Sequence, residues 1–350
     1  MSVRRAILLL ASFALGALLI GLLMRLGRVD LGLTMRELKH VSLVDMLKLL
    51  LLNGLLVLLS TMKWRTTDSA IRHPSDFVPS RITAYTVSSL GMALGLVLPV
   101  QFGMMAARTV GTLAYGRTLK RGTGGTVFEQ AFDLLVTFLL SVASIVTWLG
   151  NGEAWTWGVC ALAAVALAII AVKPLLWLME TLLSTRSEKA VRGLVSRIFP
   201  GQSSFVERSL RTFFGVRQSG LMSPRLVRRL LVLSALRFGV IVLMAEQAAV
   251  MTGANIRLWT MAAAIPFAAI SNFIAITPGG VGVNELTSVT ALHVFGIPMA
   301  VASQWAIANR VLLTESCFIV AIASMATAAL VRSCPRIFGN RRSATGVKEI

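Results

Sequence analysis

The chain has 350 residues, of which 56% are hydrophobic and only 14% are charged, and its mean hydropathy is +0.77. Runs of about 20 apolar residues recur along it, each long enough to cross the hydrocarbon core of a bilayer. This composition excludes a soluble domain and predicts an all-α polytopic membrane protein. The net charge of +19 indicates basic cytoplasmic loops and contact with anionic lipid, and it does not favour nucleic acid as a partner.

Eight long apolar segments and two shorter ones are the predicted elements. The long ones lie at about 6–24, 44–62, 82–98, 126–149, 155–178, 229–251, 258–277 and 311–331. The short ones, at about 102–116 and 283–297, follow Pro99 and Pro278. The first long run ends without an obvious small-residue cleavage site, so we interpret it as a retained helix and not as a signal peptide.

The distribution of basic residues selects the topology. Eight full crossings would place the basic 179–229 region opposite the equally basic C-terminal tail. The conflict disappears if 82–116 and 258–297 are each a re-entrant helical hairpin, which leaves about six full transmembrane helices. With the N-terminus inside, the inside regions then carry 25 of the 34 Lys and Arg and the outside regions carry five. This asymmetry predicts that both termini are cytoplasmic.

The same topology predicts an inverted repeat, because each half reads helix, helix, hairpin, helix in opposite orientation. The Pro99-x3-Gly103 spacing matches Pro278-x3-Gly282. Inverted repeats with interrupted helices are typical of transporters, although Pro and Gly also recur by chance in a membrane protein rich in both. The predicted units are a first repeat at 1–150, a second repeat at 151–331 and a basic cytoplasmic tail at 332–350. The second repeat includes a basic cytoplasmic segment at 179–228, which is either a set of interfacial helices or a solvated loop.

The stretch Thr277–Glu285 interrupts the apolar sequence with a Pro, three Gly and a carboxylate. Non-helical backbone at membrane depth is tolerated only where protein buries it or a wet cavity meets it. We expect Pro278, Gly279, Gly280 and Gly282 to shape a turn whose neighbouring helix start offers N–H groups to an anion. Glu285 could equally be a simple cap of that helix start.

Charged residues inside apolar segments are the other candidates for a site. Three of them are Arg108, Arg237 and Arg310, and the planar guanidinium suits phosphate. The structural alternative is that Arg108 and Arg310 pair with Glu285 or Glu315. We predict that the substrate is bound by Arg108, Arg310, Glu285, Asn284, Pro278, Gly279, Gly280, Gly282, Pro99, Gly103 and Asp133. Trp64, between Lys63 and Arg65 at the end of the second segment, is interpreted as an interfacial anchor.

Catalytic and cofactor signals are missing from the sequence. Three His and three Cys are dispersed without metal-ligand spacing or a disulfide framework. There is no Walker or Rossmann glycine pattern and no nucleophile–base pair. We therefore expect no cofactor, no metal site and no catalytic residue.

The residues from Thr277 to Glu285 resemble the Pro-Gly-Gly-x-Gly-x-Arg-Glu motif of the lysylphosphatidylglycerol synthase transmembrane region, also called the flippase-like family. The resemblance covers about residues 5–330, and the remaining matches lie in order along the chain: Lys63-Trp64-Arg65, Leu98-Pro99, Gly103, Arg108, Glu129, Asp133, Gly296 and Arg310. The chain departs from the family pattern at Asn284 and Gln130, where the family has Arg, and at Met104 or Met105, where it has an acidic residue.

The resemblance implies a bacterial or archaeal cytoplasmic membrane protein that moves a lipid for cell-envelope synthesis. The lipid would be a charged phospholipid, such as an aminoacylated one, or a polyprenyl-phosphate-linked sugar. Some family members also carry a soluble aminoacyl-transfer domain, which we do not expect in a chain that stops at Ile350. The expected partners are the lipid substrate and the anionic lipid surface, with envelope-synthesis enzymes and a second copy of the chain as further candidates. An integral-membrane enzyme acting on a lipid carrier and a non-transporting scaffold remain as alternatives.

Overall fold

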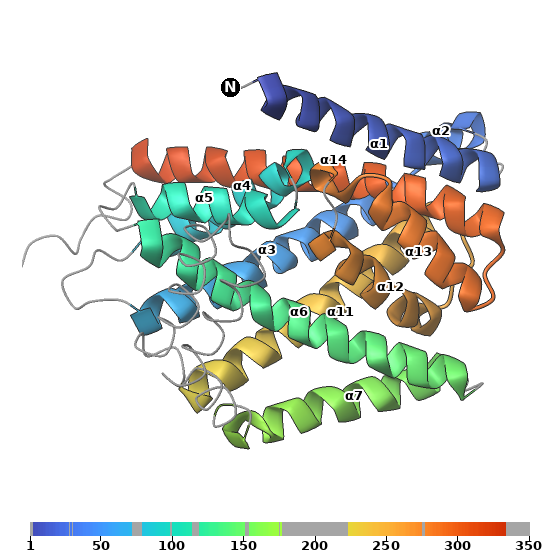
Figure 1. Ribbon diagram of the computed structural model, residues 1–350. Helices are drawn as coiled ribbons and strands as arrows, with labels where there is room; N and C mark the ends of the chain where they lie inside the picture. The colour runs from blue at the N-terminus through green and yellow to red at the C-terminus, as the bar shows by residue number, and fades with distance from the viewer. Residues whose placement is uncertain are drawn as a thin grey trace, which may run out of the picture.

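The computed structural model describes residues 3–27, 29, 31–71, 79–98, 100–113, 119–150, 154–174, 176, 223–274 and 277–333. Within these ranges every regular element is helical, which confirms the predicted all-α class. In chain order the elements are α1 (Val3–Gly27), α2 (Leu31–Lys39), α3 (Leu43–Ile71), α4 (Arg81–Val97), α5 (Val100–Leu113), α6 (Leu119–Leu149), α7 (Ala154–Ile170), α11 (Pro224–Met251), α12 (Leu258–Ile274), the 3₁₀ turn η2 (Pro278–Gly280), α13 (Val283–Val294) and α14 (Met299–Ser333) (Figure 1).

Three helices in the described part are long and apolar enough to cross a membrane by themselves. They are α3, the Thr123–Leu149 part of α6 and the Met299–Val331 part of α14. Each of the ten apolar segments expected from the sequence has a corresponding helix, whereas the short helix α2 was not expected. The basic segment 179–228 and the tail 332–350 lie outside the described residues except for 223–228 and 332–333, so the predictions for them stay predictions.

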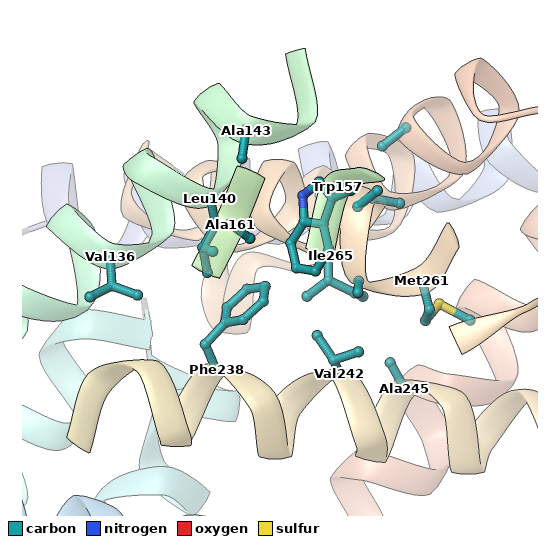
Figure 2. Packing of buried hydrophobic residues seen from close by; sticks show 14 of the residues in the cluster. Val136, Leu140, Ala143, Trp157, Ala161, Phe238, Val242, Ala245, Met261 and Ile265 are labelled. Carbon is teal, nitrogen blue, oxygen red and sulfur yellow. The ribbon is translucent and has the colours of Figure 1, made fainter. Parts of the chain in front are cut away.

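The largest apolar core joins α6, α7, α11 and α12. Val136 and Leu140 of α6 face Phe238 of α11 across this core, with Trp157 of α7 and Ile265 of α12 beside them (Figure 2). The indole N–H of Trp157 donates to Ser144 Oγ at 2.8 Å, so the one polar atom of this ring is satisfied in the core. Large apolar side chains on the outward faces, such as those of Leu162 and Ile170, remain exposed, as expected for faces that contact lipid.

Helices α4 and α5 pack against each other as an antiparallel pair. Gly103 of α5 lies so close to the backbone of Gly95 that a Cβ at 103 would collide with it, and Gly111 lies against Val87 near the other end. At the break between the helices, Leu98 offers its carbonyl oxygen to the N–H of Gly279 in η2 at 2.9 Å. The turn before α13 therefore contacts the end of the α4–α5 pair directly.

Helix α1 covers the other side of this junction. Gly16 of α1 lies against Val281, and Leu19 lies against Gly282, so α1 packs directly on the turn before α13. It also runs beside α14, where Gly27 meets Ser303 (Figure 1). The turn is thus enclosed by protein, which satisfies the condition for irregular backbone at membrane depth.

Candidate functional site

Arg108 is the most enclosed arginine of the described residues. Its side chain is 1% exposed, and its Nη1 donates to Glu129 Oε2 at 2.6 Å while its Nη2 donates to the Ser60 carbonyl at 2.9 Å. The guanidinium carbon lies 5.6 Å from the ring centroid of Trp64, within the range of a cation–π contact. The partner of Arg108 is thus Glu129, and not Glu285 or Glu315 as the structural alternative supposed. Its contacts hold α3, α5 and α6 together.

Asp133 of α6 bridges two cations. Its Oδ1 accepts from Lys63 Nζ at 2.6 Å, and its Oδ2 accepts from Arg237 Nη1 at 2.9 Å. Lys63 is completely buried and also donates to the Glu129 carbonyl at 3.2 Å. Arg237 reaches Ser60 Oγ at 3.1 Å through its Nε, yet 24% of its side chain remains exposed. Contacts among Lys63, Asp133, Arg237 and Ser60 thus connect α3, α6 and α11 beside the Arg108–Glu129 pair.

Trp64 corrects one expectation from the sequence. Helix α3 continues past it to Ile71, and Trp64 is buried under Arg108. The interpretation of Trp64 as an interfacial anchor is therefore wrong. Its ring is buried inside the protein, where it packs against the guanidinium group of Arg108.

The Pro-Gly-Gly turn adopts backbone angles that only glycine takes at low cost. Gly279, Gly280 and Gly282 have φ values of 59°, 68° and 82°. A Cβ at Gly279 would collide with the carbonyl oxygen of Leu96 and with Arg310. Glu285 Oε2 accepts from the Gly282 N–H at 2.6 Å, so Glu285 does cap the start of α13.

Arg310 of α14 joins this turn to the rest of the site. Its Nη1 donates to the Gly279 carbonyl at 2.9 Å and lies 3.5 Å from Glu285 Oε1. Its side chain is 20% exposed, in contrast to that of Arg108. Arg310 therefore meets Glu285, as the structural alternative supposed, while part of its surface remains accessible.

A cavity of about 270 Å³ is lined by residues of two charged groups. The first group surrounds Arg108 and Asp133, and the second is Arg310 with Glu285 at the Pro-Gly-Gly turn. Its lining includes Arg108, Glu129, Asp133 and Arg237 of the first group, and Gly279, Asn272, Asn284 and Arg310 in or near the second. Asn272 Oδ1 and Arg108 Nε are buried without a hydrogen-bond partner in the described residues. Such atoms are rare in folded proteins and are explained most simply by water or a polar ligand.

The charges around this cavity do not balance. Lys63, Arg108, Arg237 and Arg310 face Glu129, Asp133 and Glu285, which leaves one formal positive charge in excess in this described network. Burying a net charge in a membrane protein is costly unless an ion or water compensates it. The site is therefore suited to a monoanion, such as a phosphodiester.

The structure gathers most of the predicted site residues in this region. Arg108, Asp133, Gly279, Asn284 and Arg310 line the cavity, and Glu285, Gly280, Gly282 and Pro278 form its turn. Gly103 packs within the α4–α5 pair, and Pro99 lies outside the described residues. Lys63, Glu129 and Arg237 were not among the predicted binding residues. Lys63 and Glu129 were nevertheless part of the family resemblance, and the position of Arg237 inside an apolar segment was the signal for that residue.

Comparison with protein-family models gives a match over most of the chain. The family model for the lysylphosphatidylglycerol synthase TM region aligns with residues 9–323. No curated protein matches the sequence. The aligned range includes every residue of the charged network and the whole Pro-Gly-Gly turn.

Proposed function

This chain belongs to the lysylphosphatidylglycerol synthase transmembrane-region family, and from that premise we propose that it moves a charged lipid between membrane leaflets. The membership and the apolar helices make it an integral membrane protein associated with lipid or envelope functions. The substrate would be a charged phospholipid or a polyprenyl-phosphate-linked sugar. Its head group would enter the central cavity while its apolar chains stay in lipid.

The observation that carries this proposal is the cavity lined by Arg237 and Arg310. These two side chains combine partial exposure with attachment to carboxylates that hold them in place. A volume of about 270 Å³ is near the lower end of ligand pockets, so it fits a head group and not a whole lipid. Arg108 is buried and paired with Glu129, so we assign it the role of holding α3, α5 and α6 in place around the cavity, and not that of contacting the phosphate.

The proposal includes a topology of about six full crossings and two re-entrant hairpins, α4–α5 and α12–α13. The antiparallel packing of α4 and α5 and the hydrogen bond from Gly279 to Leu98 support it, since both are expected if the hairpin tips meet inside the membrane. The helix order also supports an inverted repeat, with α1, α3, α4–α5 and α6 in one half and α7, α11, α12–α13 and α14 in the other. Rocking of one half against the other would expose the cavity to each leaflet in turn.

Translocation by purified protein in liposomes tests the proposal. Fluorescent phosphatidylglycerol, an aminoacylated phosphatidylglycerol and a polyprenyl-phosphate sugar would be compared. We expect one class to move, and Arg237→Gln and Arg310→Gln each to slow it by about tenfold or more, because each removes a charge-assisted contact to phosphate.

Arg225→Gln is the matched control, since Arg225 is exposed on the same helix as Arg237 and does not line the cavity. It should transport at the wild-type rate. Equal rates for wild type, both cavity variants and empty liposomes would reject transport by this protein alone and favour the scaffold. Release of a chemically altered lipid would favour the membrane enzyme.

A further inference from the structure

A second and larger cavity, of about 740 Å³, lies away from the central one. Helices α3, α4, α11 and α14 surround it, and Arg65, Arg81 and Arg229 line it. No carboxylate is among its described lining residues. This distinguishes it from the central cavity, where each basic side chain has an acidic partner.

The positive charge of Arg65 is not neutralised by an acidic side chain among the described lining residues of this cavity. The Nη1 atom of Arg65 is buried and has no hydrogen-bond partner among the described residues. Leaving a buried charged donor unpaired costs free energy that an anion would recover. The hydroxyl of Tyr85, which also lines the cavity, does have a partner, since it donates to the Gly54 carbonyl at 3.2 Å.

Besides Ser, Thr and Tyr side chains, the cavity has an apolar part that faces outward. Leu58 and Met62 of α3 line it and are also exposed on the surface of the helix. Because α3 is long and apolar enough to span the membrane, these side chains lie on a face suited to acyl or prenyl chains. A cavity lined by three arginines and by an exposed apolar surface fits an amphiphile with an anionic head.

Its position along the helices favours a lipid from the basic side of the membrane. The cavity lies near the C-terminal ends of α3 and α14 and the N-terminal end of α11, which Figure 1 places toward the same end of the molecule. The chain next to these ends carries the basic sequence at 63–81, 173–229 and 332–350. Such clusters attract anionic lipid and are retained on the cytoplasmic side.

We propose that this second cavity binds the phosphate ester of a membrane lipid, with the phosphate held by Arg65, Arg81 and Arg229 and the chain lying along Leu58 and Met62. Guanidinium groups suit this task because they stay charged and offer several donors to phosphate oxygens. Binding at this cavity stands on its own geometry. Its further role, as the place where a lipid is loaded before it reaches the central cavity, rests on the proposed function.

Native mass spectrometry of the full chain in detergent tests the binding. The probes are dioctanoyl phosphatidylglycerol, farnesyl phosphate, inorganic phosphate and the neutral dioctanoylglycerol. We expect wild type to hold an anionic lipid with an affinity that falls about tenfold in Arg229→Gln and in Arg65→Gln. Arg228→Gln is the matched control, because Arg228 is exposed beside Arg229 and does not line the cavity.

The relative affinities of the probes identify the lipid class. Stronger binding of farnesyl phosphate than of phosphatidylglycerol would assign the site to a prenyl carrier, and the reverse would assign it to a phospholipid. Equal affinity in wild type, Arg229→Gln and Arg65→Gln would overturn the proposal, as would equal binding of the neutral lipid. The same titration with Arg310→Gln separates the two sites. Lipid held at the central cavity should be lost in this variant, whereas the binding that Arg229→Gln and Arg65→Gln weaken should remain, whether or not liposome transport is observed.

Discussion

Gly279 holds the turn before α13 in a left-handed backbone conformation against two neighbours. Its φ is 59°, and a Cβ there would meet the Leu96 carbonyl and Arg310. Conformational strain and overlap with rigid backbone therefore act together at this residue. No flexible side chain alone can relieve the overlap, because the Leu96 oxygen belongs to the main chain of α4.

Gly279→Ala should therefore lower the free energy of unfolding by about 2 kcal/mol or more. Two glycines provide controls. Gly253 has a φ of 64° with open space around it, so Gly253→Ala isolates the conformational strain. Gly239 is within α11 and also faces open space, so Gly239→Ala should leave stability unchanged or raise it. Thermal unfolding in detergent measures all three, and equal melting temperatures for the alanine variants at 279 and 239 would contradict this account.

At the scale of elements, the Arg108–Glu129 pair joins α5 to α6 in a buried setting. Removing one member of such a pair leaves an uncompensated charge, which typically costs about 3–5 kcal/mol. Arg108→Met should thus destabilise the protein strongly. Arg108→Met combined with Glu129→Gln should be less destabilised than Arg108→Met alone, because both charges are then removed.

The measurement is a double-mutant cycle by thermal unfolding in detergent, completed by Glu129→Gln alone. A coupling free energy of at least about 1 kcal/mol is expected for groups in direct contact. Strictly additive effects would mean that the pair contributes nothing beyond its separate members, and the proposed role of the pair in positioning the cavity wall would be lost.

The helices were largely predictable from sequence, whereas their ends and partners were not. Apolar runs predict helices at membrane depth because a lipid-exposed backbone must satisfy its own hydrogen bonds. Hydropathy does not predict the last part of α3, because Lys63, Arg65 and Asp68 give this part the composition of a water-exposed segment. Lys63 is instead buried, and its charge is compensated by Asp133, a residue 70 positions later in the chain.

The candidate site was likewise predictable in part. The Pro-Gly-Gly turn was predictable because its glycines are visible as a break in an apolar run. The pairing of Arg108 with Glu129 and of Arg237 with Asp133 was not, since ion pairs depend on which helix faces meet after packing. The sequence showed which charges are costly in lipid, and the tertiary structure shows which of them compensate one another.

At the scale of the whole molecule, the distribution of Lys and Arg predicts the orientation in the membrane. Single cysteines in a variant whose three native cysteines are replaced by serine report it. With a membrane-impermeant maleimide applied to intact cells, Asn151→Cys and Asn255→Cys should be labelled, while Ser203→Cys and Ser343→Cys should be labelled only after the cells are opened. Labelling of the last two in intact cells would reverse the topology.

The excess positive charge of the central network has a consequence for how the membrane voltage would act on transport. A net charge that moves through the full potential gains or loses about 2.3 kcal/mol per 100 mV. A bound lipid with a net charge of −1 would cancel the excess, so the occupied network would cross the field as a nearly neutral group. The empty protein would keep its charge, and the voltage would then act on the return step and not on the step that carries the lipid.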